Sequence, residues 1–319
     1  MKNREEKAED LHVSVLLTES LEFLAPERGG VFVDATLGLG GHTEAILQSS
    51  DETKIIGIDQ DLEAIAYAKK RLEKYGERFQ VFHANFSEIE NVLAEAEIEK
   101  VDGVLADLGV SSLQFDSETR GFSFRYDAPL DMRMNANLED ETAAELLERL
   151  SEFEIARIIY EYGEERFSRR IARRIVEKRE SGKSPQTTRE LAEIVTSAVR
   201  TSKKDKIHPA TRTFQALRIA VNGELEILEK FLRAAIEKLN KEGRLVVISF
   251  HSLEDRIVKQ TLQKLAGKCT CPPNFPKCVC GAEKKVEILT KKPVVTNDEE
   301  IETNPRARSA KLRACLKLS

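Results

Sequence analysis

The chain has 319 residues, of which 33% are charged, and a formal net charge of −5. This charge argues against a uniformly basic coat for nucleic acid but leaves local basic patches open. The charged start MKNREEKAED has no apolar core for export, and no stretch approaches the ~20 apolar residues of a membrane span. We therefore expect a cytoplasmic protein without a membrane partner, with one large domain or two smaller ones.

Apolar runs that are typical of strands alternate with helical patterns in the first third of the chain. The runs are VFVDATLG at 31–38, KIIGID at 54–59, FQVFHANF at 79–86 and VDGVLADLG at 101–109. Amphipathic stretches such as DLEAIAYAKKRLEKYG separate them. This series predicts an α/β fold with a doubly wound parallel sheet, which binds ligands at the carboxyl ends of its strands.

The alternation stops after Gly109 and resumes with the predicted strand GRLVVISF at 243–250. Apolar residues at helical spacing occupy roughly a hundred residues between these points. We interpret this stretch as an inserted helical domain at 112–211, between two parts of the sheet domain at 1–111 and 212–319. The alternative is a single domain in which the same helices cover the sheet.

The first predicted strand leads into a glycine-rich turn, DATLGLGGHTEAIL at 34–47. A dinucleotide fingerprint would need a third glycine where Thr43 stands, and a phosphate loop would need a lysine that is absent here. The remaining interpretation is a turn that lets the backbone approach a ligand, followed by a helix whose first N–H groups receive an anion such as a carboxylate. The alternative is a tight turn without a ligand.

Asp59 ends the second predicted strand, where a carboxylate can accept hydrogen bonds from both hydroxyls of a ribose. Together with the glycine turn, this acid indicates a nucleoside that carries a carboxylate, and S-adenosylmethionine is the commonest such ligand. Two other functions stay open on the residues alone: a nicotinamide-dependent dehydrogenase, against which Thr43 argues, and a non-catalytic RNA-binding protein.

Blocks of unusual sequence follow one another from about His12 to the C-terminus. They include HVSVLLTESLEFL, RGFSFRYDAPLDMRM, TFQALRIAVNGEL, VVISFHSLEDRIVK and NPRARSAKLR. In this order they resemble the bacterial MraW (RsmH) family. The resemblance implies a Rossmann-like, S-adenosylmethionine-dependent methyltransferase with an inserted helical domain. It also implies methylation of N4 of a specific cytidine in the decoding region of 16S ribosomal RNA, by direct in-line transfer, within the small ribosomal subunit.

The same resemblance implies a set of cofactor contacts. They are Gly40, Gly41, His42, Asp59, Phe86, Asp107 and Gln114. Phe86 can pack on adenine, Asp107 can accept hydrogen bonds near the reacting end, and Gln114 offers both a donor and an acceptor. On the residue pattern alone, Phe86 is equally a core aromatic, and the His42 ring is incidental to its place at the start of a helix.

Methyl transfer to the amine of cytosine needs assistance, because the nitrogen lone pair is delocalised into the ring. The enzyme must orient the amine in line with the methyl group and accept its N–H hydrogens. Asp107, at the end of the fourth predicted strand, is the catalytic candidate. DNA amino-methyltransferases follow the corresponding residue with two prolines and an aromatic, which this chain lacks, so other residues must hold the base.

Substrate-binding candidates follow the fifth predicted strand. Phe250, His251 and Ser252 lie at its carboxyl end, at the same edge of the sheet. The alternative is structural: Ser252 caps the next helix, with Asp255 near the acidic position of a capping box. The sequence favours a structural His251 over a general base.

Basic residues concentrate in the predicted insertion. Arg169, Arg170, Arg173 and Arg174 share one helix face at three- and four-residue spacing, which suits an RNA backbone. The alternative is a solvated face paired with nearby glutamates. The resemblance favours RNA.

The five cysteines are expected to stay reduced or to bind metal. Four of them, Cys269, Cys271, Cys278 and Cys280, form two C-x-C pairs in CTCPPNFPKCVC. Four thiolates could hold zinc, although C-x-x-C is the usual spacing; the alternative is a proline-rich loop without a metal. Methyl transfer needs no metal, and we assign no metal ligand.

Overall fold

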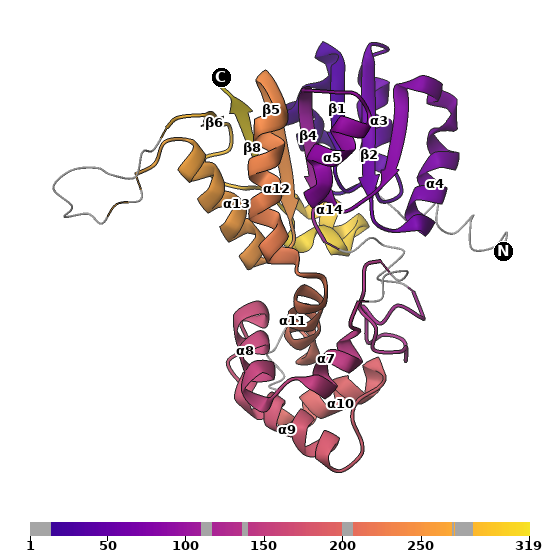
Figure 1. The fold of residues 1–319 in the computed structure, drawn as a ribbon, viewed down its shortest axis with the longest axis vertical. Helices are drawn as coiled ribbons and strands as arrows, with labels where there is room; N and C mark the ends of the chain where they lie inside the picture. Colours follow the sequence, from indigo (N-terminus) through magenta and orange to yellow (C-terminus); the bar gives the residue numbers. More distant parts are fainter. Residues whose placement is uncertain (1–13, 110–116, 136–139, 200–206, 270, 272–282) are drawn as a thin grey trace. The chain divides into compact units, whose positions relative to one another are not determined.

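The computed structural model describes residues 14–109, 117–135, 140–199, 207–269, 271 and 283–319 (Figure 1). The chain forms two compact units, one of Met1–Gly109 with Leu225–Ser319, the other of Val110–Glu224. The sequence predicts the second boundary at residue 211. In the structure α11 (Ala210–Asn222) crosses that position and buries Phe214 and Leu217 in the helical core.

The first unit is built on one mixed sheet. Its strands are β1 (Gly30–Asp34), β2 (Thr53–Asp59), β3 (Phe79–His83), β4 (Val101–Asp107), β5 (Leu239–Ser249), β6 (Val286–Ile288), β7 (Val294–Val295) and β8 (Lys311–Lys317). The order is β3-β2-β1-β4-β5-β8-β6, with β7 also paired to β8. All pairs from β3 to β5 are parallel, whereas β8 runs antiparallel to β5. The predicted α/β, Rossmann-like fold class is therefore confirmed, and strand order reverses between β1 and β4, where such sheets bind ligands.

Helices cover both faces of the sheet, because the side chains of each buried strand alternate between two cores. The α-helices of this unit are α2 (Leu17–Leu24), α3 (Gly41–Ser49), α4 (Leu62–Leu72), α5 (Ile89–Glu95), α12 (Glu224–Lys238), α13 (Ser252–Leu265) and α14 (Asp298–Thr303). Short 3-10 helices lie at η1 (Pro26–Arg28), η2 (Glu73–Arg78), η3 (Phe86–Glu88) and η4 (Pro305–Ser309). One core joins α5, α12 and α13 to β4 and β5, and the other joins α2, α3 and α4 to the opposite face.

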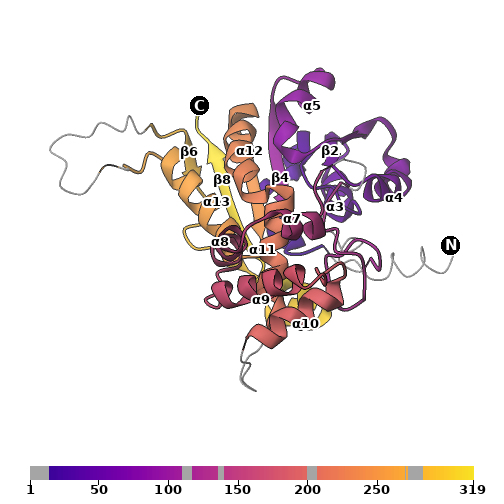
Figure 2. The same ribbon diagram turned by 60° about the horizontal axis from the view of Figure 1, so that its bottom comes forward.

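The second unit is helical (Figure 2). Besides α11 it contains α7 (Ala143–Arg149), α8 (Glu152–Gly163), α9 (Ser168–Glu180) and α10 (Thr188–Ala198). Three helices begin at capping boxes, in which Thr142, Ser151 and Thr187 cap the backbone and a glutamate three residues later returns the bond. The ends of the helices are therefore specified locally by the sequence.

The Asn222 side chain of α11 binds the backbone of the segment 117–135. The Asn222 amide oxygen accepts a hydrogen bond from the Met134 N–H at 2.8 Å, and its amide nitrogen donates to the Met132 carbonyl at 2.9 Å.

In the part of the chain that the structure describes, no helix has the length and apolar character needed to cross a membrane.

The start of β4 is bound to its neighbours through Asp102. Its carboxylate accepts one hydrogen bond from the Val31 N–H and one from the Asn240 side chain, each 2.8 Å long. Asp102→Ala should lower the free energy of unfolding by about 1–3 kcal/mol, because the Val31 N–H loses its acceptor. Urea unfolding measures this value.

Asn240→Ala is the matched control, since it leaves the bond from Val31 intact. It should cost less than Asp102→Ala. Equal losses from the two substitutions would show that the bond to Val31 contributes nothing.

Candidate active site

Three parallel strands end in an aspartate at the same edge of the sheet. Asp34 ends β1, Asp59 ends β2 and Asp107 ends β4. The strand register pairs Asp34 with Gly57 of β2 and with Leu105 of β4, so the three strand ends lie side by side. Carboxylates from separate stretches of sequence therefore meet at one edge.

The glycine turn joins β1 to α3 over these strand ends. Gly38 and Gly40 adopt positive φ values of 50° and 77°, which favour glycine. The packing adds a second constraint: a Cβ on Gly40 would lie 3.0 Å from Leu72, and one on Gly41 would collide with the Ser14 hydroxyl. Because α3 begins at Gly41, the N–H groups of Gly41 and His42 are in its first turn, where helices receive anions.

Asp59 holds this turn in place. Its carboxylate accepts a hydrogen bond from the Gly38 N–H at 2.8 Å and another from the Asp61 N–H at 2.9 Å. Burial raises the pKa of Asp59 above its ordinary value. Each carboxylate oxygen can accept a further bond, so the role at a ribose remains available. The sequence did not reveal the bond to Gly38, because it depends on the turn's conformation.

Asp34 fixes the other side of the turn from a fully buried position. It accepts hydrogen bonds from the Thr43 hydroxyl at 2.7 Å and the Thr36 N–H at 3.2 Å. Burial raises its pKa to about 6. The sequence pattern did not identify Asp34 as a site residue, although it is the first residue of the DATLG block, which begins the glycine turn.

Asp107 carries the third strand-end carboxyl group. Burial raises its pKa well above the ordinary value, and the carboxylates of Asp34 and Glu254 raise it further. Its Oδ1 atom is enclosed and has no hydrogen-bond partner among the described residues. The Asp107 N–H donates to the Thr36 hydroxyl at 2.6 Å, which fixes the backbone. An enclosed acceptor without a donor is suited to a group brought by a ligand.

The His42 ring connects two parts of the site. Its Nε2 lies 3.0 Å from the Val15 carbonyl and donates to it, while Nδ1 lies 3.9 Å from Asp107 Oδ2. The ring is thus a link between the N-terminal segment and a strand-end carboxylate, which its place at the start of α3 could not show.

Of the predicted cofactor contacts Phe86 and Gln114, the structure describes only Phe86. Phe86 begins η3 after β3, and its half-buried ring packs edge-on against Phe231, with 5.0 Å between ring centres. One side of the ring therefore belongs to the core, and contact with adenine stays a prediction. Gln114 lies outside the described residues, as do Cys278 and Cys280 of the predicted zinc alternative.

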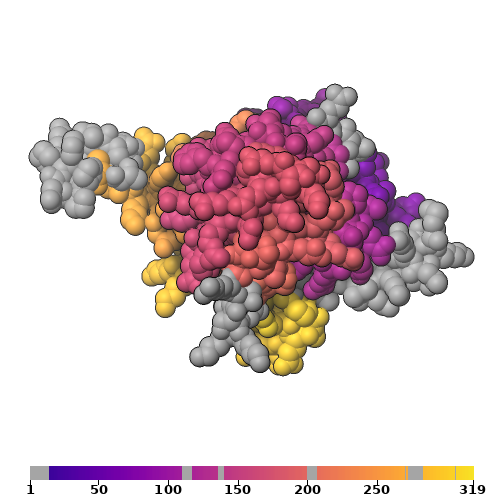
Figure 3. All heavy atoms as spheres, turned by 90° about the horizontal axis from the view of Figure 1, so that it is seen from below, coloured from indigo at the N-terminus to yellow at the C-terminus, as the bar shows by residue number. Residues whose placement is uncertain are grey.

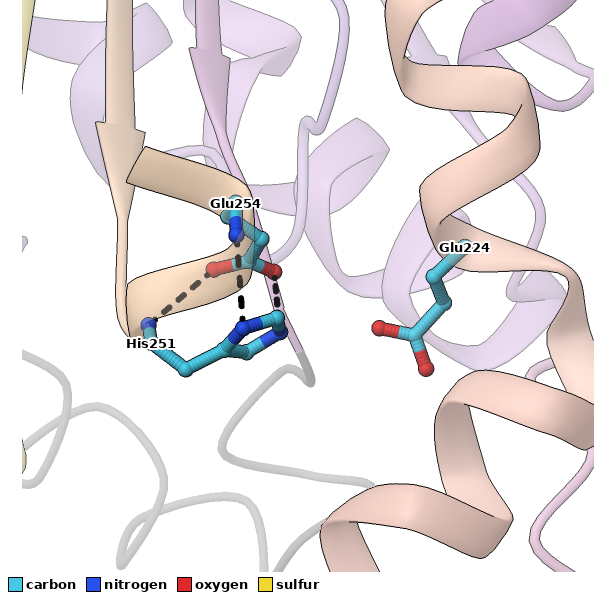
Figure 4. A group of neighbouring side chains, drawn as sticks. All are labelled: Glu224, His251 and Glu254. Atoms are coloured by element: carbon cyan, nitrogen blue, oxygen red, sulfur yellow. Dashed lines mark hydrogen bonds and ion pairs between the residues drawn. The ribbon is translucent and has the colours of Figure 1, made fainter. Parts of the chain in front are cut away.

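His251, not Ser252, caps α13 (Figure 4). The His251 Nδ1 accepts from the Glu254 N–H at 3.4 Å, and the Glu254 carboxylate accepts from the N–H groups of Phe250 and His251. The His251 Nε2 lies 3.1 Å from the same carboxylate. The predicted cap with Ser252 and Asp255 is wrong, because Asp255 pairs with Arg313 at 2.7 Å instead.

This arrangement gives His251 a structural role, as the sequence favours. Nδ1 accepts from a helix N–H, which occupies that nitrogen in the cap, and Nε2 lies beside the buried Glu254 carboxylate. Phe250 lies beside the end of β4, since a Cβ on Gly109 would be 3.4 Å from its ring. Of the three substrate-binding candidates, Phe250 is the one that the structure brings against the end of β4.

The four arginines lie on the exposed side of α9, opposite the buried Ile171 and Ile175. Two of them make ion pairs, Arg173 with Glu152 at 3.7 Å and Arg174 with Glu177 at 2.9 Å. These exposed pairs contribute little stability, so the arginines remain available to an anionic partner.

The comparison with known families decides the class of protein. The model of the MraW methylase family matches residues 9–318. The chain belongs to the MraW methylase family. This methylase takes its methyl group from S-adenosylmethionine, as the sequence predicts, and a dehydrogenase is excluded.

Curated relatives of this methylase extend over almost the whole chain. A protein of Geobacter sulfurreducens is 54% identical over 309 residues, with 96% of this chain and 99% of the relative covered. One of Clostridium botulinum (strain Loch Maree / Type A3) is 52% identical over 308 residues, with the same coverage. Both are named "Ribosomal RNA small subunit methyltransferase H". A solved structure, a putative rRNA methylase from Clostridium thermocellum, is 12% identical with a TM-score of 0.44, covering 97% of this chain and 100% of that one.

Asp59→Ala should weaken cofactor binding roughly a hundredfold. The substitution removes two charge-assisted acceptors for the ribose, each contributing about 1.5 kcal/mol, and it also releases the Gly38 N–H. Calorimetric titration with S-adenosylhomocysteine measures the affinity.

Glu63→Ala serves as the control, because it removes one exposed carboxylate from the same segment and should leave the affinity unchanged. A folded Asp59→Ala variant with full affinity would refute the assignment of Asp59 to the ribose.

Proposed function

We propose that the chain methylates N4 of a cytidine in the decoding region of 16S ribosomal RNA, within the small ribosomal subunit in the cytoplasm. Relatives 51–54% identical to it bear the name of a small-subunit ribosomal RNA methyltransferase. The observation that carries the chemistry is the enclosed Asp107 Oδ1 at the end of β4, which has no hydrogen-bond partner among the described residues.

The strand-end residues fit S-adenosylmethionine. The glycine turn and the first N–H groups of α3 are suited to its carboxylate, and Asp59 to its ribose hydroxyls. Phe86 would contact the adenine from its unpacked side. The Asp107 Oδ1, which has no hydrogen-bond partner in the described part of the chain, lies at the neighbouring strand end, where it would face the methionine part of the ligand.

Asp107 also has the properties of a proton acceptor for the amine. When bound, S-adenosylmethionine supplies an electrophilic methyl group. As the cytosine nitrogen forms its bond to that methyl carbon, it develops positive charge and must lose a proton. A carboxylate with a raised pKa is a stronger base than an ordinary aspartate, and it can receive this proton and pass it to water.

Three neighbouring side chains affect the protonation state of Asp107. Asp34 and Glu254 disfavour its ionised form, whereas a protonated His42, 3.9 Å away, would favour it. The carboxylate is the form that accepts a proton. Methyl transfer should therefore become faster as pH rises through the raised pKa of Asp107.

The helical unit contributes the RNA contacts in this proposal. Arg169, Arg170, Arg173 and Arg174 stand on the exposed face of α9 and can follow the phosphates of an RNA backbone. Such phosphate contacts supply affinity and orientation without reading the base sequence.

The reaction itself is tested with small subunits from cells that lack the enzyme. Incubation with S-adenosylmethionine carrying a labelled methyl group, followed by nucleoside analysis, should give labelled N4-methylcytidine. Naked 16S RNA, assayed in parallel, tells whether the assembled subunit is required. Label in another nucleoside would overturn the proposal.

Asp107→Asn should slow methyl transfer about 10²–10³-fold, because the amide keeps the size of the side chain but cannot take up the proton. The measurement is a single turnover at saturating S-adenosylmethionine, where a defect limited to cofactor binding disappears. The rise of the wild-type rate with pH should be lost in this variant. A rate restored by saturation would make Asp107 a cofactor contact alone.

Changing the four α9 arginines to glutamine should weaken RNA binding and flatten its dependence on salt. Each lost phosphate contact reduces the slope of log affinity against log salt by about 0.7–0.9. Fluorescence anisotropy at several salt concentrations measures both values. Cofactor affinity should stay constant.

The control replaces four exposed lysines of the first unit by glutamine: Lys54, Lys69, Lys230 and Lys241. It removes the same charge and should alter the slope less. An identical slope for the arginine variant and the wild type would identify the α9 face as solvated surface.

A further inference from the structure

Helix α8 exposes two aromatic rings to solvent. Phe153 is 75% exposed and Tyr160 is 63% exposed, the two highest values among the exposed large hydrophobic side chains of the described residues. Rings left in water bury no apolar area in the fold itself. A single exposed ring is ordinary, so the pair is informative through its arrangement.

The two rings stand in one line along the helix with a guanidinium between them. At 100° per residue, Phe153, Arg157 and Tyr160 lie within about 60° of one another, and the rings are roughly 10 Å apart along the axis. Arg157 is exposed as well. The buried residues of α8, which include Ile155 and Ile159, lie on another side of the helix, so this line has no partner in the described part of the fold.

Charges of both signs surround this line: α8 itself carries Glu152, Glu154 and Glu161, and the neighbouring α9 carries the four exposed arginines. Helix α9 packs beside α8, and the Arg173–Glu152 ion pair joins the two helices next to Phe153. Figure 3 draws all heavy atoms as spheres, and the pink and red residues of the helical unit face the reader. Glu164 follows Tyr160 by one helical turn and is the C-cap residue of α8, so the line of side chains stops there. The arginines of α9 therefore complement a polyanion whose apolar faces could meet the rings.

We propose that Phe153, Arg157 and Tyr160 form a stacking platform for unpaired bases of RNA, while the α9 arginines contact its phosphates. This inference rests on the proposed function. Every base has a flat π-face that stacks on an aromatic ring or on a guanidinium plane, whereas a duplex hides these faces. The platform therefore gives the helical unit a preference for single-stranded or looped RNA that phosphate contacts alone do not provide.

The test compares single-stranded and duplex RNA of the same length. Fluorescence anisotropy with the full chain should show that Phe153→Ala and Tyr160→Ala each weaken binding to the single strand about tenfold. Affinity for the duplex should change less than about twofold, and the salt dependence should stay constant. Phe153→Tyr and Tyr160→Phe retain a ring and should bind as the wild type does.

Val295→Ala is the control for loss of exposed apolar surface, because Val295 is 57% exposed and belongs to the other unit. The inference is overturned if the double alanine variant binds the single strand normally, or if it loses duplex affinity equally. Normal binding to naked RNA with weaker binding to small subunits would assign the rings to a protein partner instead. Methyl transfer by the wild type is scored separately, so a failure of the proposed function is distinguishable from a failure of the platform.

Discussion

Two strand-end carboxylates, the buried Asp34 and the partly buried Asp59, hold the glycine turn, and the candidate site depends on that attachment. Asp34 binds the turn through Thr36 and Thr43, and Asp59 binds it through Gly38. A buried carboxylate is costly unless donors compensate for the lost water, and these backbone and hydroxyl groups provide them. The turn is therefore fixed at both strand ends before any ligand arrives, which is what a preformed binding site requires.

The parallel part of the fold could be predicted because its strands are continuous apolar runs. The runs containing Val33, Ile56 and Val104 are buried on both faces, and such runs are typical of strands in a covered parallel sheet. The C-terminal strands were not predicted: β6 and β7 are very short, and β8 contains Arg313 and Lys317 in buried positions. Arg313 is tolerated there because Asp255 neutralises it, a partner 58 positions away that no local pattern reveals.

The candidate site could likewise be predicted only in part from the sequence. Strand-end position was enough to select Asp59 and Asp107, because the carboxyl ends of parallel strands meet at one edge. The links between them were not visible, since His42 reaches back to Val15 and Asp34 reaches forward to Thr43 only in the folded chain. The capping error has a simple cause: serine is a favoured cap and histidine a rare one, but the buried Glu254 selects His251.

The strand-end acids also set the stability of the site. Burial raises the pKa of Asp34 from 3.8 to about 6, so the folded chain holds that proton more tightly than the unfolded chain does. Between these two pH values the free energy of unfolding consequently falls as pH rises, and at neutral pH the ionised carboxyl weakens the fold. A ligand with a positive charge at this edge favours the ionised carboxylates of Asp34 and Asp107 and offsets part of that loss. The strand-end carboxyl groups are thus least favourable when the site is empty and the pH is neutral.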